Sequence, residues 1–107
     1  MTIANTILEQ LGGARFIVMT GSKDFVGDKN SLTMKLARNA SKANMLKITL
    51  TSMDDYTVEF YRYSAGHFTK SYEWKEAKRT TIRQFTGIYC DQLQELFTEV
   101  TGLYTHF

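Results

Sequence analysis

YCDQLQELFTEV, residues 89–100, is the most regularly amphipathic segment of this 107-residue sequence. Its large apolar side chains recur at i, i+4, i+7, i+8 and i+11, and they are Tyr89, Leu93, Leu96, Phe97 and Val100. At 3.6 residues per turn these positions form one stripe along a helix. Burying such a stripe contributes roughly 10 kcal/mol before the opposing entropy, enough to hold a small sheet against the helix. Thr86-Gly87 and Gly102 are expected to cap and end this helix.

The N-terminal third predicts a further helix, then a strand and a loop. A helical stripe of Ile3, Ile7, Leu8 and Leu11 stops at Gly12-Gly13 and predicts the first helix. Residues 15–20 (RFIVMT) are dense in β-branched and apolar side chains between glycines, which predicts a central strand covered on both faces. Residues 21–31 (GSKDFVGDKNS) are rich in Gly, Asp, Asn and Ser, which predicts a loop.

Three later segments alternate apolar and polar residues with the period of two that is typical of strands. They span residues 32–37, 46–51 and 56–61, and the polar connections between them predict an antiparallel meander. Residues 68–74 and 80–85 then predict a hairpin with its turn at residues 76–79. A short helix over residues 72–79 is the alternative.

Together these segments predict an α+β fold in a single domain over residues 1–107. The fold begins with an N-terminal helix and continues with an antiparallel sheet of four to six strands. The C-terminal amphipathic helix packs on one face of this sheet. The opposite face is expected to be partly exposed.

The composition bounds the class of protein. Hydrophobic residues make up 43% and aromatic residues 13% of the chain, which argues against disorder. No apolar run reaches the length of a membrane span and no signal-peptide pattern opens the sequence, so we expect a cytoplasmic protein. The single cysteine, Cys90, agrees with a reducing compartment because it has no partner for an internal disulfide.

The net charge of +2 hides an asymmetry along the chain. Residues 1–87 hold 13 basic and 8 acidic side chains, whereas residues 88–107 hold three acidic ones and no Lys or Arg. The acidic residues Asp91, Glu95 and Glu99 form a ridge on the predicted C-terminal helix. A basic body can meet nucleic acid or an acidic protein, and the acidic ridge can meet a basic surface.

Few side chains are placed for catalysis. Cys90 with His67 is a conceivable nucleophile and base, but a lone cysteine is more often a small buried hydrophobe. Residues 20–23 (TGSK) follow a predicted strand without the spacing of a phosphate-binding loop. We therefore expect no enzyme activity, no catalytic, cofactor-binding or metal-binding residues, and no cofactor.

Basic and aromatic residues predict two contact surfaces. The first comprises the polar face of the meander and its adjoining loop, with Lys35, Arg38, Lys42, Lys47, Tyr61 and Tyr63. The second is a cluster close to Tyr72, with Trp74, Lys75, Lys78, Arg79 and Arg83. Cations beside stackable rings on a sheet face are typical of proteins that bind single-stranded nucleic acid, although Glu59 on the same face weakens this interpretation. The alternative is an ordinary solvated face whose tyrosines are half covered by lysine stems.

Several short segments resemble a group of small uncharacterised proteins encoded by bacteriophages and other mobile elements. They are QLGG at 10–13, FIVMTG at 16–21, RN at 38–39, KITL at 47–50, LFTE at 96–99 and TGLYT at 101–105. Residues 72–84 look like an insertion in that pattern. The shared segments are structural in kind, so the resemblance implies a genomic setting and no catalytic residue. Small phage proteins often bind and block a host machine, including restriction or CRISPR complexes.

The leading hypothesis is therefore a non-enzymatic phage or mobile-element protein that binds a host protein or ribonucleoprotein complex in the bacterial cytoplasm, in the manner of an anti-CRISPR or anti-restriction inhibitor. The alternative is a single-stranded nucleic-acid-binding protein that uses the basic and aromatic sheet face. Neither hypothesis involves a membrane. The chain is expected to be a monomer or a small homo-oligomer.

Overall fold

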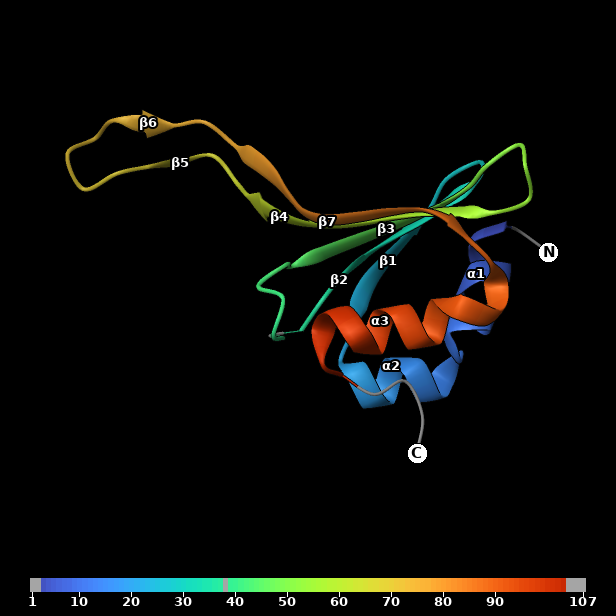
Figure 1. The fold of residues 1–107 in the computed structure, drawn as a ribbon. Helices are drawn as coiled ribbons and strands as arrows, with labels where there is room; N and C mark the ends of the chain where they lie inside the picture. Colours follow the sequence, from blue (N-terminus) through green and yellow to red (C-terminus); the bar gives the residue numbers. More distant parts are fainter. Residues whose placement is uncertain (1–2, 38, 104–107) are drawn as a thin grey trace.

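A computed structural model describes residues 3–37 and 39–103 and confirms the α+β architecture (Figure 1). Helices α1 (Ile3–Leu11) and α2 (Ala14–Thr20) precede the strands. The five-stranded antiparallel sheet has the order β1-β2-β3-β4-β7. Its strands are β1 (Lys23–Gly27), β2 (Ser31–Lys35), β3 (Met45–Leu50), β4 (Tyr56–Ser64) and β7 (Lys78–Ile88). The short strands β5 (His67–Phe68) and β6 (Trp74–Lys75) pair with each other, and the 3-10 helix η1 (Cys90–Gln92) leads into α3 (Leu93–Thr101).

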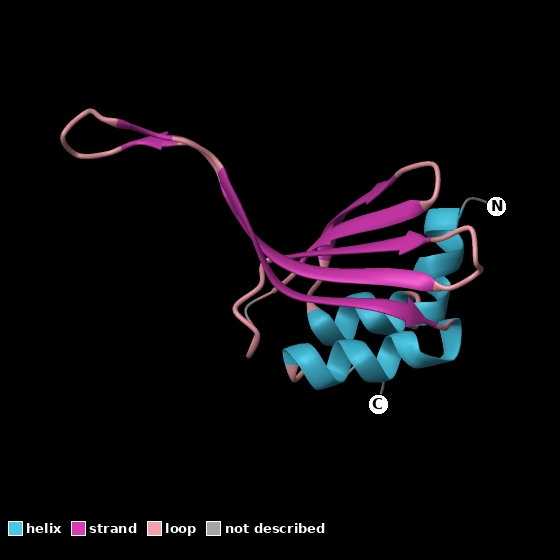
Figure 2. Cartoon of the chain, turned by 45° about the horizontal axis from the view of Figure 1, so that its top comes forward, coloured by secondary structure: helices cyan, strands magenta, loops and turns pink. Residues whose placement is uncertain are grey.

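The helices all lie on one face of the sheet (Figures 1 and 2). Between the layers, the ring of Phe97 on α3 lies edge-on to Phe16 of α2, with ring centroids 4.9 Å apart. On the sheet side Phe60 of β4 lies 6.4 Å from the Phe97 ring. All three rings are at most 1% exposed. The predicted packing of the C-terminal helix on one face of the sheet is therefore confirmed.

The ends of α3 differ from the expectation at one terminus only. Gly102 ends the helix as predicted, with φ of 75° and its N–H bonded to the carbonyl oxygen of Thr98 at 2.8 Å. At the start, Thr86 still belongs to β7, and η1 forms the first turn before α3 begins at Leu93. Tyr89 is consequently 57% exposed and does not join the buried stripe.

The first helix is confirmed over residues 3–11, with Ile7 and Leu11 completely buried. Gly13 closes the helix by donating its N–H to the carbonyl of Leu8 at 3.0 Å. A hydrogen bond of 2.7 Å from the Tyr56 hydroxyl to Gln10 Oε1 ties α1 to β4.

The prediction of a central strand over residues 15–20 is wrong, because this segment is helix α2. Phe16 and Thr20, one turn apart, are buried, whereas Ile17 is 37% and Val18 76% exposed. A short apolar run does not by itself distinguish a strand from a helix. Here the contact of Phe16 with Phe97 outweighs the β propensity of the neighbouring residues.

The prediction of a loop over residues 21–31 is also wrong, because residues 23–27 form the edge strand β1. Strand pairing uses backbone groups, so a segment rich in Gly and Asp can add to β2 despite its composition. Phe25 packs against the core, while Val26 is 62% exposed. The pairing is irregular between Lys23 and Val26, where Asp24 has φ of 56°.

A two-stranded projection is the most unusual feature of the fold (Figure 2). Strands β4 and β7 continue past the end of β3 and carry β5 and β6 away from the body, so that the molecule measures 49 × 32 × 23 Å. We define residues 64–78 as the hairpin arm. The predicted pairing of residues 68–74 with residues 80–85 is wrong, because residues 80–85 pair with β4 and β5 pairs with β6. The alternative helix over 72–79 is also wrong. The turn lies at residues 69–73 and not at 76–79, because Thr69 exchanges backbone and side-chain hydrogen bonds with Glu73.

Candidate binding surfaces

The sheet face opposite the helices, here called the outer face, is not covered by any helix of the described chain (Figure 1). Lys47 of β3 lies beside Thr33 of β2, and Lys35 of β2 lies beside Met45 in the next row. The residues between them along each strand, such as Met34 and Leu46, are buried on the helix side. Side chains alternate across a strand, so Lys35 and Lys47 share the outer face.

Lys23, which the sequence pattern places in a loop, extends this surface. Lys23 of β1 is directly opposite Lys35, and both side chains are exposed. Two like charges opposite each other repel unless an anion lies between them. The sequence pattern did not reveal Lys23 because its segment resembled a loop.

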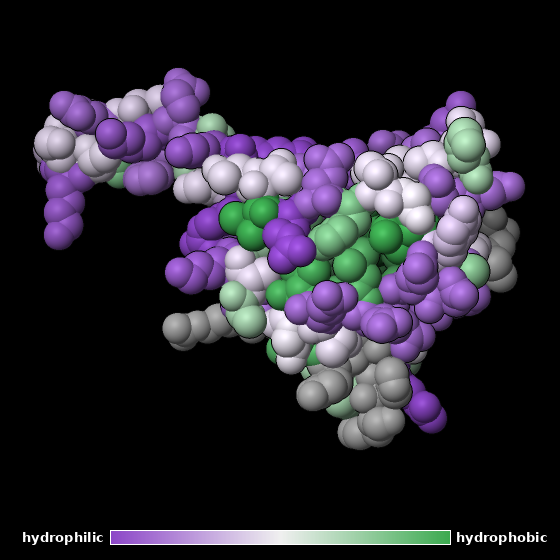
Figure 3. Space-filling model, in the orientation of Figure 1, coloured by the Kyte–Doolittle hydropathy of each residue, from purple (hydrophilic) through white to green (hydrophobic). Residues whose placement is uncertain are grey.

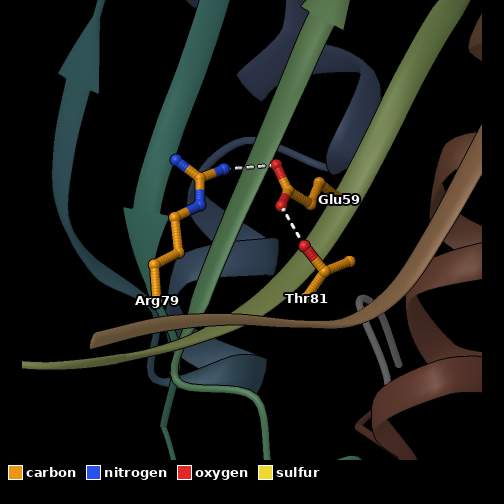
Figure 4. A network of polar contacts seen from close by, with 3 residues as sticks. All are labelled: Glu59, Arg79 and Thr81. Carbon is orange, nitrogen blue, oxygen red and sulfur yellow. Dashed lines mark hydrogen bonds and ion pairs between the residues drawn. The ribbon is translucent and has the colours of Figure 1, made fainter.

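A polar network covers part of the outer face (Figure 4). The Arg79 guanidinium pairs with one carboxylate oxygen of Glu59, and the Thr81 hydroxyl donates to the other at 2.8 Å. The same guanidinium lies 4.0 Å from the ring centroid of Tyr61. Arg79, the residue that follows the arm in β7, thus lies on the outer face, and Glu59 offsets its charge.

Tyr61 and Tyr63 differ in accessibility. Tyr61 is only 7% exposed, whereas Tyr63 is 47% exposed. Burial raises the pKa of Tyr61 above its ordinary value of 10.0, against the opposing charge of Arg79 and with a smaller contribution from Glu59. Tyr63 therefore presents a free ring, and Tyr61 is accessible to a base only if Arg79 moves.

The remaining basic residues of the first predicted surface are placed elsewhere. Lys42 and Arg62 line a groove of about 590 Å³ that also includes the buried core residue Leu36. The Arg62 guanidinium donates to the carbonyl oxygen of Lys42 at 3.0 Å. Arg38 lies outside the described residues.

The second predicted cluster is divided between the arm and the body. Trp74 and Lys75 form β6, and Lys78 pairs with Ser64 at the base of the arm. Arg83 belongs to the body, where its guanidinium lies 5.1 Å from the ring centroid of Phe85. Because Phe85 packs against the core, Arg83 lies on the helix side of β7 and away from Arg79.

The arm displays aromatic side chains that no core covers. Phe68 is 69%, Tyr72 88% and Trp74 52% exposed. The rings of Phe68 and Trp74 are in edge contact with centroids 5.0 Å apart. Trp74 also lies so close to Gly66 that a Cβ at this glycine would be 2.5 Å from Trp74 Cζ2. The sequence pattern does not distinguish Phe68 from a core residue, because its exposure depends on the arm leaving the body.

Tyr72 has an unusual backbone conformation at the turn of the arm. Its φ of 64° lies in the left-handed region, which is uncommon for a bulky residue. The hydrogen bond of 2.9 Å from its N–H to the carbonyl of Thr69 holds this turn. The turn therefore presents the tyrosine ring outward.

The acidic ridge of Asp91, Glu95 and Glu99 is exposed on η1 and α3, as the helical spacing predicts. All three residues line a groove of about 980 Å³ with Gln10, Cys90, Gln94 and Thr98. On the opposite side of the ridge, Glu95 and Glu99 border a recess of about 200 Å³ with Ile88, Gln92 and Leu96.

Cys90 and His67 lie in different parts of the molecule. Cys90 opens η1 directly after β7, while His67 belongs to the arm at the other end of that strand (Figure 1). The interpretation of Cys90 as a buried hydrophobe is wrong, because its side chain is exposed. Among residues 3–37 and 39–103, no three His, Cys, Asp or Glu side chains gather as a metal site would require.

Comparisons with known proteins give no relative from which a function can be transferred: no family model, curated protein or solved structure matches this chain. In the described part of the chain, no helix has the length and apolar character needed to span a membrane.

Proposed function

We propose that this chain is a non-enzymatic binding protein that contacts a macromolecular partner through its hairpin arm. The observation that carries the proposal is the exposure of Phe68, Tyr72 and Trp74 on an element that leaves the core. Removing a large aromatic side chain from water lowers the free energy. Tyrosine and tryptophan are among the residues most enriched in the binding hot spots of protein interfaces. The resemblance to phage proteins supports a bacterial protein or ribonucleoprotein, such as a defence complex, as the partner.

The construction of the arm supports a contact role. The arm is preorganised for binding. Phe68 and Trp74 are in edge contact, and hydrogen bonds of Thr69 hold the turn. Because less conformational entropy is then lost on association, more of the contact energy is available for affinity. The lysines Lys70, Lys75 and Lys78, which outnumber Glu73 and Glu76, favour a partner with an acidic surface.

The experiment is a capture from bacterial lysate with the chain attached through the exposed Cys90, which lies at the opposite end of β7 from the arm. The wild type should retain a defined protein or ribonucleoprotein, identified by mass spectrometry. Replacing Tyr72 and Trp74 with alanine should lower its recovery at least about tenfold, since central aromatic residues contribute about 2 kcal/mol or more.

The matched control is Met53→Ala, because Met53 is 79% exposed in the turn between β3 and β4. This variant should capture the partner as the wild type does. Capture of nothing above background, or equal capture by the arm variant, would contradict the proposal.

A second candidate function is the binding of single-stranded nucleic acid on the outer face. It is favoured by the three exposed or half-exposed lysines Lys23, Lys35 and Lys47, which share this face with the free ring of Tyr63. Phosphate neutralisation by lysines and base stacking on an aromatic ring are the two contributions that such binding requires. The cover of Arg79 over Tyr61 counts against a second stacking position.

Fluorescence anisotropy with a labelled oligouridine tests this candidate. Affinity should fall steeply with added salt, and Lys35→Glu with Lys47→Glu should abolish binding because two phosphate contacts become repulsive. The double variant Arg15→Glu with Lys29→Glu changes the net charge equally at exposed positions on α2 and in the turn after β1. Equal loss in both double variants would mean that binding does not depend on the outer face.

A further inference from the structure

The recess between β7 and α3 combines apolar and polar side chains. Figure 3 shows hydrophobic side chains gathered between the sheet and α3. The apolar Ile88 and Leu96 line the recess together with the polar residues Gln92, Glu95 and Glu99. Phe85 continues the partly buried row of β7 toward the arm. No Lys or Arg follows Ile88 in the sequence, so α3 itself supplies no cation to offset Glu95 and Glu99.

The arm has the complementary chemistry. Its aromatic side chains are exposed and unpacked against the body, and Lys75 directly follows Trp74. An aromatic ring can pack on Ile88 and Leu96, and a neighbouring ammonium group is attracted by the carboxylates of Glu95 and Glu99. Arg83 lies over Phe85, on the arm side of Ile88, so an incoming lysine would be favoured at the Ile88 end.

A chain cannot bring its own arm to its own recess. The arm leaves the sheet at Lys78, the first residue of β7, and the recess lies at Ile88, the last residue of that strand. At about 3.3 Å per residue these points are roughly 33 Å apart. The arm also points away from the helices (Figure 1).

We infer that the arm of one copy docks in the β7–α3 recess of a second copy. This inference rests on the proposed role of the arm as the contact element. Because the arm and the recess are different surfaces, the contact is head-to-tail, and repeated docking gives open chains of copies or closed rings. Only the tip of the arm and one recess are buried in each contact, so the association is weak and concentration-dependent. Self-association occupies the arm and therefore competes with capture of another partner.

The first measurement is sedimentation velocity of the wild type from about 10 µM to 1 mM, the range that suits weak interfaces. The mean sedimentation coefficient should rise with concentration and fall back with added salt. Replacing Tyr72 and Trp74 with alanine should weaken association at least about tenfold. Glu95→Lys with Glu99→Lys should abolish it, because the border of the recess then repels Lys75.

The decisive experiment mixes the two variants. The arm variant keeps an intact recess and the Glu95→Lys, Glu99→Lys variant keeps an intact arm, so each is monomeric alone and the mixture forms a one-to-one dimer that grows no further. The control Glu9→Lys with Asp54→Lys makes the same charge change at exposed positions on α1 and in the β3–β4 turn and should self-associate as the wild type does.

A wild type that stays monomeric at 1 mM, or a mixture without a dimer, would overturn the inference. Capture of the lysate partner by the Glu95→Lys, Glu99→Lys variant separates the two proposals, because its arm is intact. If that capture persists while the wild type does not self-associate, only the head-to-tail inference fails.

Discussion

The body and the hairpin arm use the same kind of side chain in opposite ways. Phe16, Phe60 and Phe97 are at most 1% exposed in the body, whereas Phe68 and Trp74 of the arm are 69% and 52% exposed. The body has a helical layer against its sheet, and the arm has two strands with no second layer (Figure 2). A two-stranded ribbon cannot bury its side chains by itself. An aromatic residue is therefore a core residue only where a second layer covers it.

Asn44 marks the boundary between the body and the arm. Strand β3 begins at Met45, which pairs with Tyr61. Asn44, the residue before β3, pairs with Tyr63 of β4 through its side chain and not through a further strand residue. Its amide donates to the carbonyl oxygen of Tyr63 at 2.8 Å and accepts from the Tyr63 N–H at 2.8 Å. Beyond this point β4 pairs only with β7.

The largest effect is expected in the body. Phe97→Ala removes the ring that joins α2 and β4, and burial of such a ring stabilises a core by about 3–5 kcal/mol. Urea unfolding followed by far-ultraviolet circular dichroism should show this loss. Phe68→Ala makes the same chemical change in the arm and should lower the free energy of unfolding by less than about 1 kcal/mol. Equal losses of unfolding free energy in the two variants would contradict the conclusion that only the body buries its aromatic side chains.

A smaller, local effect is expected for Gly66→Val. The added side chain overlaps Trp74, whose Cζ2 lies 2.5 Å from the position of a Cβ, and overpacking of this kind costs about 1–3 kcal/mol. The sequence contains one tryptophan, so its fluorescence reports on the arm alone. Emission should shift to the red while the far-ultraviolet signal of the body persists. Ala65→Val, at the neighbouring exposed position, is the control and should leave emission unchanged.

At the root of the arm a pH dependence is expected. Burial raises the pKa of Tyr61 above 10.0 in the folded protein, despite Arg79, and burial likewise raises the pKa of Tyr56. The unfolded chain therefore loses these protons first, so stability is complete below about pH 10 and falls as the pH rises toward the folded pKa. Urea unfolding at about pH 9 and pH 11 should show a smaller fall for Tyr61→Phe than for the wild type.

Replacement of Tyr56 and Tyr61 together should reduce that fall further. An identical pH dependence in the wild type and both variants would show that neither phenol contributes to the alkaline loss of stability.

The smallest expected effect has an informative sign. Val18 is 76% exposed on α2, and alanine favours a helix over valine by about 0.5 kcal/mol, so Val18→Ala should stabilise slightly. If residues 15–20 were a central strand, the same change would destabilise by about 2 kcal/mol. Ile48→Ala in the buried part of β3 provides the reference for such a loss. Urea unfolding of the three proteins distinguishes the two cases.

The sequence predicted the helices and strands whose apolar and polar residues alternate with a clear period. The alternation over residues 32–37, 46–51 and 56–61 gave the meander, and it placed Lys35 and Lys47 on one face. The spacing of Leu93, Leu96 and Phe97 gave the C-terminal helix. These patterns are local, because period two and period 3.6 are properties of the backbone itself.

Other features depended on partners far away in the sequence. Phe16 makes its segment a helix through its contact with Phe97, and β1 forms by pairing with β2. The pairing of β7 with β4 is irregular between Phe60 and Tyr61. This pairing places Arg79 over Tyr61 and places Arg83 on the opposite face of the sheet. A shift of one residue moves a side chain to the other face, so the pattern of β7 alone did not place these cations.

The α+β class, the meander, the two terminal helices and the separation of a basic body from an acidic helix can all be predicted from the sequence, because periodicity and charge are properties of the residue order. Which apolar and aromatic side chains stay in water depends on the folded arrangement of the strands and helices. Burial requires a second surface, and whether one is present depends on where β3 ends and how far β4 and β7 continue beyond it.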